Sequence, residues 1–181
     1  MMLSNLLQDG RASKALASSL ELAKKAAEEV RNLSHLLHPP ELDAVGLAAA
    51  VRCYAIRFSG RSGIAVEVDL QNDLERLSQE VELALFRVVQ EGLANVQRHS
   101  GSPVAAVRIS RQANQVTVEI EDEGRGVSNE ALQDGGDGAA MVGIGIAGMR
   151  DRLRQLAGSL DIASRHPGTL LKATVPLKRD T

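Results

Sequence analysis

The sequence predicts an α+β protein: a two-layer α/β sandwich with a mixed, mostly antiparallel sheet, preceded by a long N-terminal helix. Three observations carry this prediction. Five short segments alternate apolar and polar residues, as half-buried strands do, and proline-free segments between them repeat apolar residues at helical spacing. The chain has 181 residues, 44% hydrophobic and 24% charged, which suits one globular domain or one domain with a helical appendage.

The composition argues against several classes of function. Aromatic residues make up 2% of the chain and Trp is absent, which argues against stacking platforms for single-stranded nucleic acid. A formal net charge of −2 gives no basic footprint for DNA or an anionic membrane. The lone Cys53 excludes an intrachain disulfide and a cysteine zinc cluster, and its apolar neighbours predict a buried position. No apolar run approaches the roughly 20 residues of a membrane span, so a cytoplasmic location without membrane contact is expected.

The first element is a helix over Ala12–Leu37. Its apolar positions follow a heptad-like seam suited to a partner helix, and they are Leu16, Leu20, Ala23, Ala27, Val30 and Leu37. Because such a narrow apolar stripe cannot form a core alone, we expect this segment to be half of a helical hairpin or part of a dimer. Pro39 and Pro40 end it, because proline lacks the amide hydrogen and pushes its predecessor out of helical space.

The remaining elements follow in order. Further helices are predicted over Leu47–Phe58, Glu80–Ser100 and Ile146–Ala157, with a short helical turn over Ser128–Leu132. Strands are predicted over Ile64–Leu70, Val104–Ile109, Val116–Ile120, Leu160–Ala163 and Thr169–Val175, the second and third forming a hairpin. Gly60 and Gly63 stop the first of these helices, and Asp134–Gly138 is too rich in glycine for regular structure.

The helix over Glu80–Ser100 organises the rest. Its apolar stripe, which predicts a core face, consists of Val81, Leu85, Val88, Val89 and Val96. Glu91 and Asn95 lie four residues apart, so they share one face at the edge of that stripe. A carboxylate and an amide so placed can orient a water, a hydroxyl or a magnesium ion, although two ordinary surface residues would look the same.

The sequence contains two glycine-rich motifs, one directly after a predicted strand and one directly before a predicted helix. Asp122-x-Gly124-x-Gly126 ends a strand, where glycines let the backbone approach a ligand and Asp122 can accept a hydrogen bond from an exocyclic amine; a plain turn also explains it. Gly143-x-Gly145-x-x-Gly148 opens a helix, and a glycine-rich helix N-terminus suits an anion. It lacks the preceding strand of a dinucleotide fold, so phosphate binding and a structural role both stay open.

Three histidines invite a functional reading. His35 and His38 precede the two prolines, but no acidic residue follows either one closely to raise its basicity. His99 lies four residues beyond Asn95 and is the better candidate for a place near a ligand.

Taken in order, these motifs resemble the catalytic part of a bacterial sensor histidine kinase with the GHKL or Bergerat ATPase fold, of the nitrate-sensor and DesK-like class. The resemblance covers nearly the whole chain. It is carried by Leu33-Ser-His-Leu-Leu-His-Pro-Pro-Glu-Leu42 with Gly46-Leu47, Gln90-Glu-Gly-Leu-Ala-Asn95 with Arg98-His99, the two glycine motifs, Met149-Arg150 and Gly168-Thr169.

The resemblance implies a role for each of these positions. Asn95 would hold Mg2+ through its amide oxygen, Glu91 would orient or deprotonate the attacking imidazole, and Asp122 would bind the adenine amine with Thr169 sharing a water. The other ATP-binding positions it implies are His99, Gly124, Gly126, Gly143, Gly145 and Gly148, with residues 133–142 as the ATP lid. Ile144 departs from the family's usual polar residue, and Gly92 from its usual alanine.

The resemblance also implies the domains and partners. Residues 1–40 would be a partial dimerisation and phosphotransfer helix, and residues 41–181 the ATP-binding catalytic domain. The family's phosphorylated histidine, followed by an acidic residue, has no match here, so the chain is expected to bind ATP without phosphorylating itself. The partners would be the histidine-bearing dimerisation helix and the receiver domain of a response regulator, in a full-length protein that forms a homodimer.

Two other readings share the motifs. An anti-sigma-type serine kinase has the same ATPase fold, but its family lacks a heptad-like N-terminal helix. A non-catalytic module would use ATP only to switch the lid and its partner contacts.

Overall fold

The computed structural model describes residues 40–71, 74–112, 114–126 and 140–177. Contacts divide the chain into two units, residues 1–40 and 41–181, and the described residues define the fold of the second. Several predicted features lie outside the described residues: the helix over Ala12–Leu37, the candidate histidines His35 and His38, the turn over Ser128–Leu132 and the loop over Asp134–Gly138.

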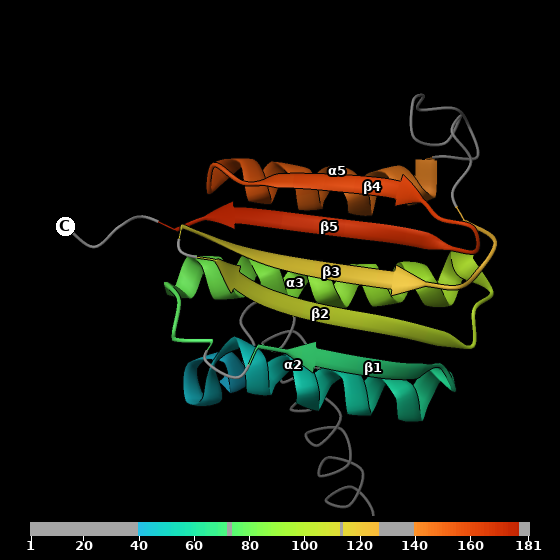
Figure 1. The fold of residues 1–181 in the computed structure, drawn as a ribbon, viewed down its shortest axis with the longest axis horizontal. Helices are drawn as coiled ribbons and strands as arrows, with labels where there is room; N and C mark the ends of the chain where they lie inside the picture. Colours follow the sequence, from blue (N-terminus) through green and yellow to red (C-terminus); the bar gives the residue numbers. More distant parts are fainter. Residues whose placement is uncertain (1–39, 72–73, 113, 127–139, 178–181) are drawn as a thin grey trace, which may run out of the picture. The chain divides into compact units, whose positions relative to one another are not determined.

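Five strands form one sheet in the order β1-β2-β3-β5-β4 (Figure 1). The strands are β1 (Ala65–Leu70), β2 (Val104–Gln112), β3 (Gln115–Asp122), β4 (Ser159–Ser164) and β5 (Thr169–Pro176). Only β1 and β2 pair in parallel, while the other three pairings are antiparallel. The predicted mixed, mostly antiparallel sheet is therefore confirmed. The alternating patterns in the sequence correspond to these five strands.

Helices cover one face of this sheet (Figure 1). They are α2 (Pro40–Ser62), α3 (Gln79–Asn95) and α5 (Ala140–Gln155), and a π-helical turn, η1 (Val96–Ser100), continues α3. The predicted stripe of α3 and η1 is buried as expected, with Val81 at 8% exposure and the other four residues at 4% or less. The two-layer α/β sandwich is thus confirmed for the described residues.

Helix α2 begins earlier and ends later than predicted. Gly46 interrupts it with φ 76° and ψ 174°, so the predicted start at Leu47 marks the second of two helical pieces. Gly60 does not stop it, and the helix ends at Ser62 before Gly63, whose φ of 73° suits a glycine helix end. The expectation that Cys53 is buried was wrong. It lies on the exposed face of α2, where apolar sequence neighbours at helical spacing belong to the opposite face.

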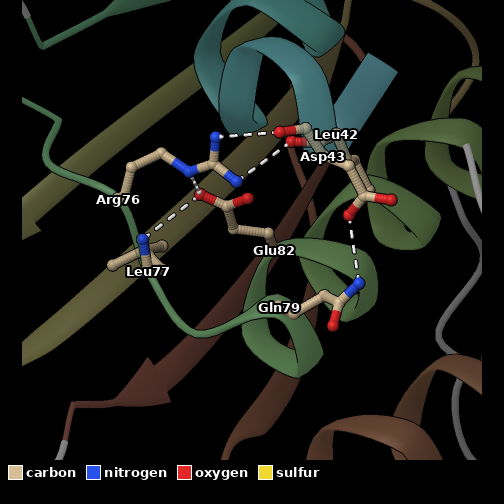
Figure 2. Close-up of polar contacts among 6 residues, drawn as sticks. All are labelled: Leu42, Asp43, Arg76, Leu77, Gln79 and Glu82. Atoms are coloured by element: carbon tan, nitrogen blue, oxygen red, sulfur yellow. Dashed lines mark hydrogen bonds and ion pairs between the residues drawn. The ribbon is translucent and has the colours of Figure 1, made fainter. Parts of the chain in front are cut away.

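A buried glutamate anchors the start of α3 to the first piece of α2. Glu82 Oε1 accepts hydrogen bonds from Arg76 Nε at 3.1 Å and from the Leu77 amide at 3.2 Å. Figure 2 shows the same arginine reaching across to α2, where its Nη2 donates to the Leu42 carbonyl at 3.2 Å and its Nη1 to the Asp43 carbonyl at 3.4 Å. Glu82 is only 2% exposed, so these donors replace the water that a buried carboxylate gives up.

Candidate functional site

A cavity of about 230 Å³ lies between the end of α3, the helix α5 and strands β3, β4 and β5. Residues from all of these elements line it: Gly92, Asn95, Val96, His99, Ser100, Ile120, Asp122, Arg125, Gly126, Ile146, Ile162, Thr169 and Leu171. Five of the predicted site residues are therefore brought together, namely Asn95, His99, Asp122, Gly126 and Thr169. A largely apolar cavity with a few convergent polar groups is typical of a small-molecule site.

The apolar floor of the cavity is one row of the sheet. Ile120 of β3 is the cross-strand partner of Leu171 of β5, which in turn pairs with Ile162 of β4. Residues in one row point to the same face of the sheet, so these three side chains form a continuous surface, and Ile146 of α5 adds to the lining. Such a surface suits a flat apolar ring. Gly92 matters here because a Cβ at this position would run into Ile120 Cδ1.

Asp122 is the polar centre of the cavity. It is 6% exposed at the end of β3, and its Oδ1 accepts the Gly124 amide at 2.8 Å. No described residue donates to Oδ2, which leaves one carboxylate oxygen for a ligand amine. Thr169 is the cross-strand partner of Asp122, so the two side chains lie next to each other on the cavity wall.

His99 carries an unsatisfied nitrogen. Its Nε2 is buried and has no hydrogen-bond partner among the described residues, although the ring lines the cavity. Leaving a buried polar atom unpaired costs about 1–3 kcal/mol, so a ligand group that pairs with this atom would gain binding energy. Arg125, which also lines the cavity, fixes the backbone here by donating from Nε to the His99 carbonyl at 2.5 Å.

The turn after β3 approaches other backbone too closely for side chains. A Cβ on Gly124 would collide with the backbone of Ser100, and the neighbouring Arg125 amide donates to the Ser100 carbonyl at 3.0 Å. Gly168 has φ 95°, and a Cβ there would collide with the Asp122 carbonyl. These glycines therefore allow the end of β3 and the start of β5 to approach each other closely beside the cavity.

Glu91 lies one turn before Asn95, which lines the cavity, and Arg98 of η1 approaches both side chains. Arg98 Nη1 lies 3.4 Å from Glu91 Oε1 and 3.5 Å from Asn95 Oδ1. Both distances are long for charge-assisted hydrogen bonds, and the Glu91 side chain is 30% exposed. Glu91 does not line the cavity itself, but it abuts α5, since a Cβ on Gly145 would run into Glu91 Oε1.

Tyr54 of α2 adds a phenol near Glu91. Its ring packs edge-on against Phe86 of α3 with centroids 5.7 Å apart. Burial raises the pKa of the Tyr54 phenol, Arg61 opposes this, and the Glu91 carboxylate raises it further.

The structure places the second glycine motif differently from the prediction. Helix α5 was expected to begin at Ile146, but it begins at Ala140, so Gly143, Gly145 and Gly148 lie within the helix rather than before it. Amides beyond the first turn of a helix bond to carbonyls four residues back. Gly145 instead serves close approach to α3, which is a packing constraint that the sequence motif does not reveal.

Several cavity residues were not predicted from the sequence. Ser100 and Arg125 carry no motif that marks them, and the apolar floor looks like any other strand residues. The alternation that identified the strands does, however, contain the signal. Ile120, Ile162 and Leu171 all occupy inward positions near the strand ends that hold Asp122 and Thr169.

Comparison with known proteins defines the class of this site. Residues 80–179, more than half of the chain, match the family described as "Histidine kinase-, DNA gyrase B-, and HSP90-like ATPase". The chain therefore belongs to this ATPase family.

Curated relatives are sensor histidine kinases. The chain is 34% identical over 157 residues to the sensor histidine kinase MctS of Rhizobium johnstonii, and that match covers 87% of this chain and 33% of the relative. It is 31% identical to the oxygen sensor histidine kinase NreB of Staphylococcus carnosus, covering 86% of this chain and 44% of the relative. The chain thus spans less than half the length of either relative.

Solved structures share the fold. The histidine kinase domain of the blue-light activated histidine kinase from Erythrobacter litoralis superposes with a TM-score of 0.60 at 24% identity, covering 77% of this chain and 69% of that chain. A mycobacterial sensor histidine kinase, MprB, gives a TM-score of 0.52 at 20% identity, covering 71% of this chain and 92% of that chain. No helix within the described ranges is long and apolar enough to cross a membrane.

Proposed function

We propose that this chain is the ATP-binding kinase domain of a two-component sensor histidine kinase. It would transfer the γ-phosphate of ATP to a histidine outside residues 1–181, for relay to the receiver domain of a response regulator. The observation that carries this proposal is the position of Glu91, half-exposed at the rim of the cavity and one helical turn from Asn95, which lines it. Membership in the ATPase family and the sensor histidine kinase relatives support it.

The adenine ring is assigned to the apolar end of the cavity. Its exocyclic amine would donate to the free Oδ2 of Asp122, with Thr169 close enough to share a water. The base would pack on the row formed by Ile120, Leu171 and Ile162. His99 Nε2, buried and unpaired among the described residues, would gain a ligand partner. Gly124 and Gly126 would lie beside the base, where they admit close backbone approach.

The phosphates would extend toward Asn95 and the start of α5. Gly143, Gly145 and Gly148 are proposed as phosphate-side residues, with residues 133–142 as the lid. Because these glycines lie inside α5, a contact through their amides requires that the first turns of this helix unwind.

A magnesium ion is proposed at Asn95. No cluster of three or more acidic, histidine or cysteine side chains within the described part of the chain could hold a metal alone. Magnesium bound with ATP needs few protein ligands, since phosphate oxygens and waters fill most of its octahedral shell. The Asn95 amide oxygen, which faces the cavity rim, fits this requirement. The ion would neutralise phosphate charge when bound.

Glu91 is proposed as the residue that orients or deprotonates the attacking histidine. The imidazole nitrogen forms a bond to the γ-phosphorus while the bond between that phosphorus and the β–γ bridging oxygen breaks, releasing ADP. The proton on the other imidazole nitrogen moves to the Glu91 carboxylate. A positioned base of this kind contributes about 10²–10⁴-fold to a rate. For this proton transfer, Arg98 would have to release its long contact with Glu91.

The arrangement of the longer protein follows from this proposal. Residues 1–40 would contribute a partial dimerisation and phosphotransfer helix, and residues 41–181 the catalytic domain of a homodimer. We place the domain in the cytoplasm, where ATP is supplied.

Radiolabelled ATP tests the proposal. The chain is incubated with [γ-³²P]ATP alone, and then with synthetic helical peptides that each carry one histidine. We expect no label on the chain and an acid-labile, base-stable label on the peptide. Label on His35 or His38 would overturn the placement of the acceptor outside this chain. Acid-stable label on serine-bearing peptides alone would favour a serine kinase, and ATP binding without any transfer a non-catalytic module.

A further inference from the structure

Two arginines lie on helices that pack against each other, Arg87 on α3 and Arg152 on α5. Arg87 lies on α3 one turn before Glu91 and on the same face. It is half-buried, and its Nη1 donates to Gln90 Oε1 at 2.8 Å. Arg152 is exposed on α5, seven residues after Gly145, so it shares a face with that glycine.

The contact between Gly145 and Glu91 sets the register between the two helices. Figure 1 shows that α3 and α5 run in opposite directions. Arg152, seven residues after Gly145, and Arg87, four residues before Glu91, therefore lie on the same side of the contact between Gly145 and Glu91. Their electrostatics agree with this placement, because burial lowers the pKa of the Arg87 guanidinium and the positive charge of Arg152 lowers it further.

Neither arginine has a carboxylate partner within the described residues. Five other described arginines do, at distances between 2.7 and 3.4 Å: Arg76, Arg98, Arg108, Arg111 and Arg154. Two like charges held together, one of them half-buried, are destabilising unless an anion neutralises them. The arginine pair can therefore bind an anionic group that the described part of the chain does not supply.

ATP in the cavity would not supply the anionic group that neutralises this arginine pair. Neither arginine lines the nucleotide cavity, and Arg87 lies eight residues before Asn95 on α3, which is about 12 Å along the helix axis. The surface beside them is open, since a Cβ on Gly148, which lies on α5 between Gly145 and Arg152, would meet nothing within 4 Å. Glu91, the open space at Gly148 and the two arginines therefore lie along the boundary between α3 and α5.

We propose that Arg87 and Arg152 bind a carboxylate on the helical protein segment that presents the acceptor histidine to Glu91. This inference rests on the proposed function. A helical segment that brings its histidine to Glu91 and continues along the boundary between α3 and α5 passes the arginine pair one turn away. Because Arg87 and Glu91 are four residues apart, the partner carries its carboxylate three or four residues from the histidine, on the same helix face. Bidentate guanidinium contacts then fix the register of docking.

Paired peptides test this inference. Two fluorescent helical peptides carry one histidine and, four residues away, either Glu or Gln; a third carries Lys there. Binding to the full chain, saturated with a non-hydrolysable ATP analogue, is followed by fluorescence anisotropy. We expect the Glu peptide to bind at least about tenfold more tightly than the Gln peptide, as a charge-assisted hydrogen bond predicts. Arg87→Gln and Arg152→Gln should each abolish this preference, while the matched control Arg154→Gln, whose arginine pairs with Asp151 on α5, should retain it.

A charge exchange separates recognition from a change in folding. Arg152→Glu should prefer the Lys peptide over the Glu peptide, which no merely structural role of Arg152 would produce. Equal binding of all three peptides to the wild-type chain, or an unchanged Glu preference in both Arg→Gln variants, would overturn the inference.

Phosphoryl transfer to the same peptides distinguishes this site from the proposed function. If the Glu peptide binds through the arginines and never receives phosphate, the docking site stands and the proposed function fails. If the wild-type chain labels the Glu and Gln peptides at equal KM, the function stands and the docking site fails.

Discussion

Two of the glutamates of helix α3, Glu82 and Glu91, lie nine residues apart in opposite situations. Glu82, near its start, is 2% exposed and receives the Arg76 guanidinium at 3.1 Å and the Leu77 amide at 3.2 Å. Glu91, two and a half turns later, is 30% exposed, and the cation nearest to it is Arg98 at 3.4 Å. The first carboxylate has short contacts from a guanidinium and a backbone amide that together tie α2 to α3 (Figure 2).

The difference separates stability from chemistry on one helix. A buried carboxylate with complete partners cannot exchange them without the cost of an unpaired buried charge. A half-exposed carboxylate with one long contact can exchange its partner cheaply. Glu91 is therefore free to accept a proton or a new hydrogen bond, while Glu82 is fixed in place.

The largest expected effect comes from Glu91→Gln. The amide keeps the shape of the side chain but cannot accept the imidazole proton, so phosphoryl transfer to a histidine-bearing peptide should fall at least about 100-fold. The free energy of unfolding should change by less than about 0.5 kcal/mol, because only a partly exposed pair is lost. Transfer rates and urea denaturation measure the two quantities. Transfer at more than a tenth of the wild-type rate would show that Glu91 is not the base.

The same substitution at Glu82 should give the converse result. Glu82→Gln keeps an acceptor for the Leu77 amide but loses the charge that holds Arg76, which should lower the free energy of unfolding by about 2 kcal/mol. ATP affinity of the folded chain should remain within about twofold. Glu75→Gln is the matched control, because Glu75 pairs with Arg111 at 2.8 Å but is 78% exposed, and it should cost less than about 0.5 kcal/mol. Equal losses in the two variants would erase the distinction between the two regions.

The smallest effect is expected from Arg98→Gln. Its contacts with Glu91 and Asn95 are long and 46% of its side chain is exposed, so urea denaturation should detect a change of no more than about 0.5 kcal/mol. A loss above about 1.5 kcal/mol would mean that Arg98 and Glu91 form a structural pair like that of Arg76 and Glu82.

The sequence predicted those parts of the molecule that follow local periodicity. The alternation around Ile120 and Leu171 defined the strands, and the helical stripe through Leu85 and Val89 defined the core face of α3, because each depends on side-chain direction alone. Asp122 and Thr169 were paired only through the family resemblance, and the register of β3 with β5 makes them cross-strand neighbours.

Features that depend on packing between elements were not predictable. Helix α5 starts six residues earlier than predicted although its motif is rich in glycine, and the close approach of Gly145 to Glu91 on another helix has no local signal in the sequence. The exposed side of Cys53 depends on which face of α2 meets the sheet. Likewise, Arg87 and Arg152 are 65 positions apart in the sequence, and only the antiparallel packing of α3 and α5 makes them neighbours.

Titration of ATP, with magnesium, into three forms of the chain tests the central claim most directly, namely that Asp122 binds the nucleotide while Glu91 acts on the acceptor. Isothermal titration calorimetry should show that Asp122→Asn weakens ATP binding by at least about tenfold, because a charged acceptor for the adenine amine is lost. Glu91→Gln should bind ATP within about twofold of the wild-type chain. Unchanged affinity in Asp122→Asn, or a tenfold loss in Glu91→Gln, would contradict this division of roles.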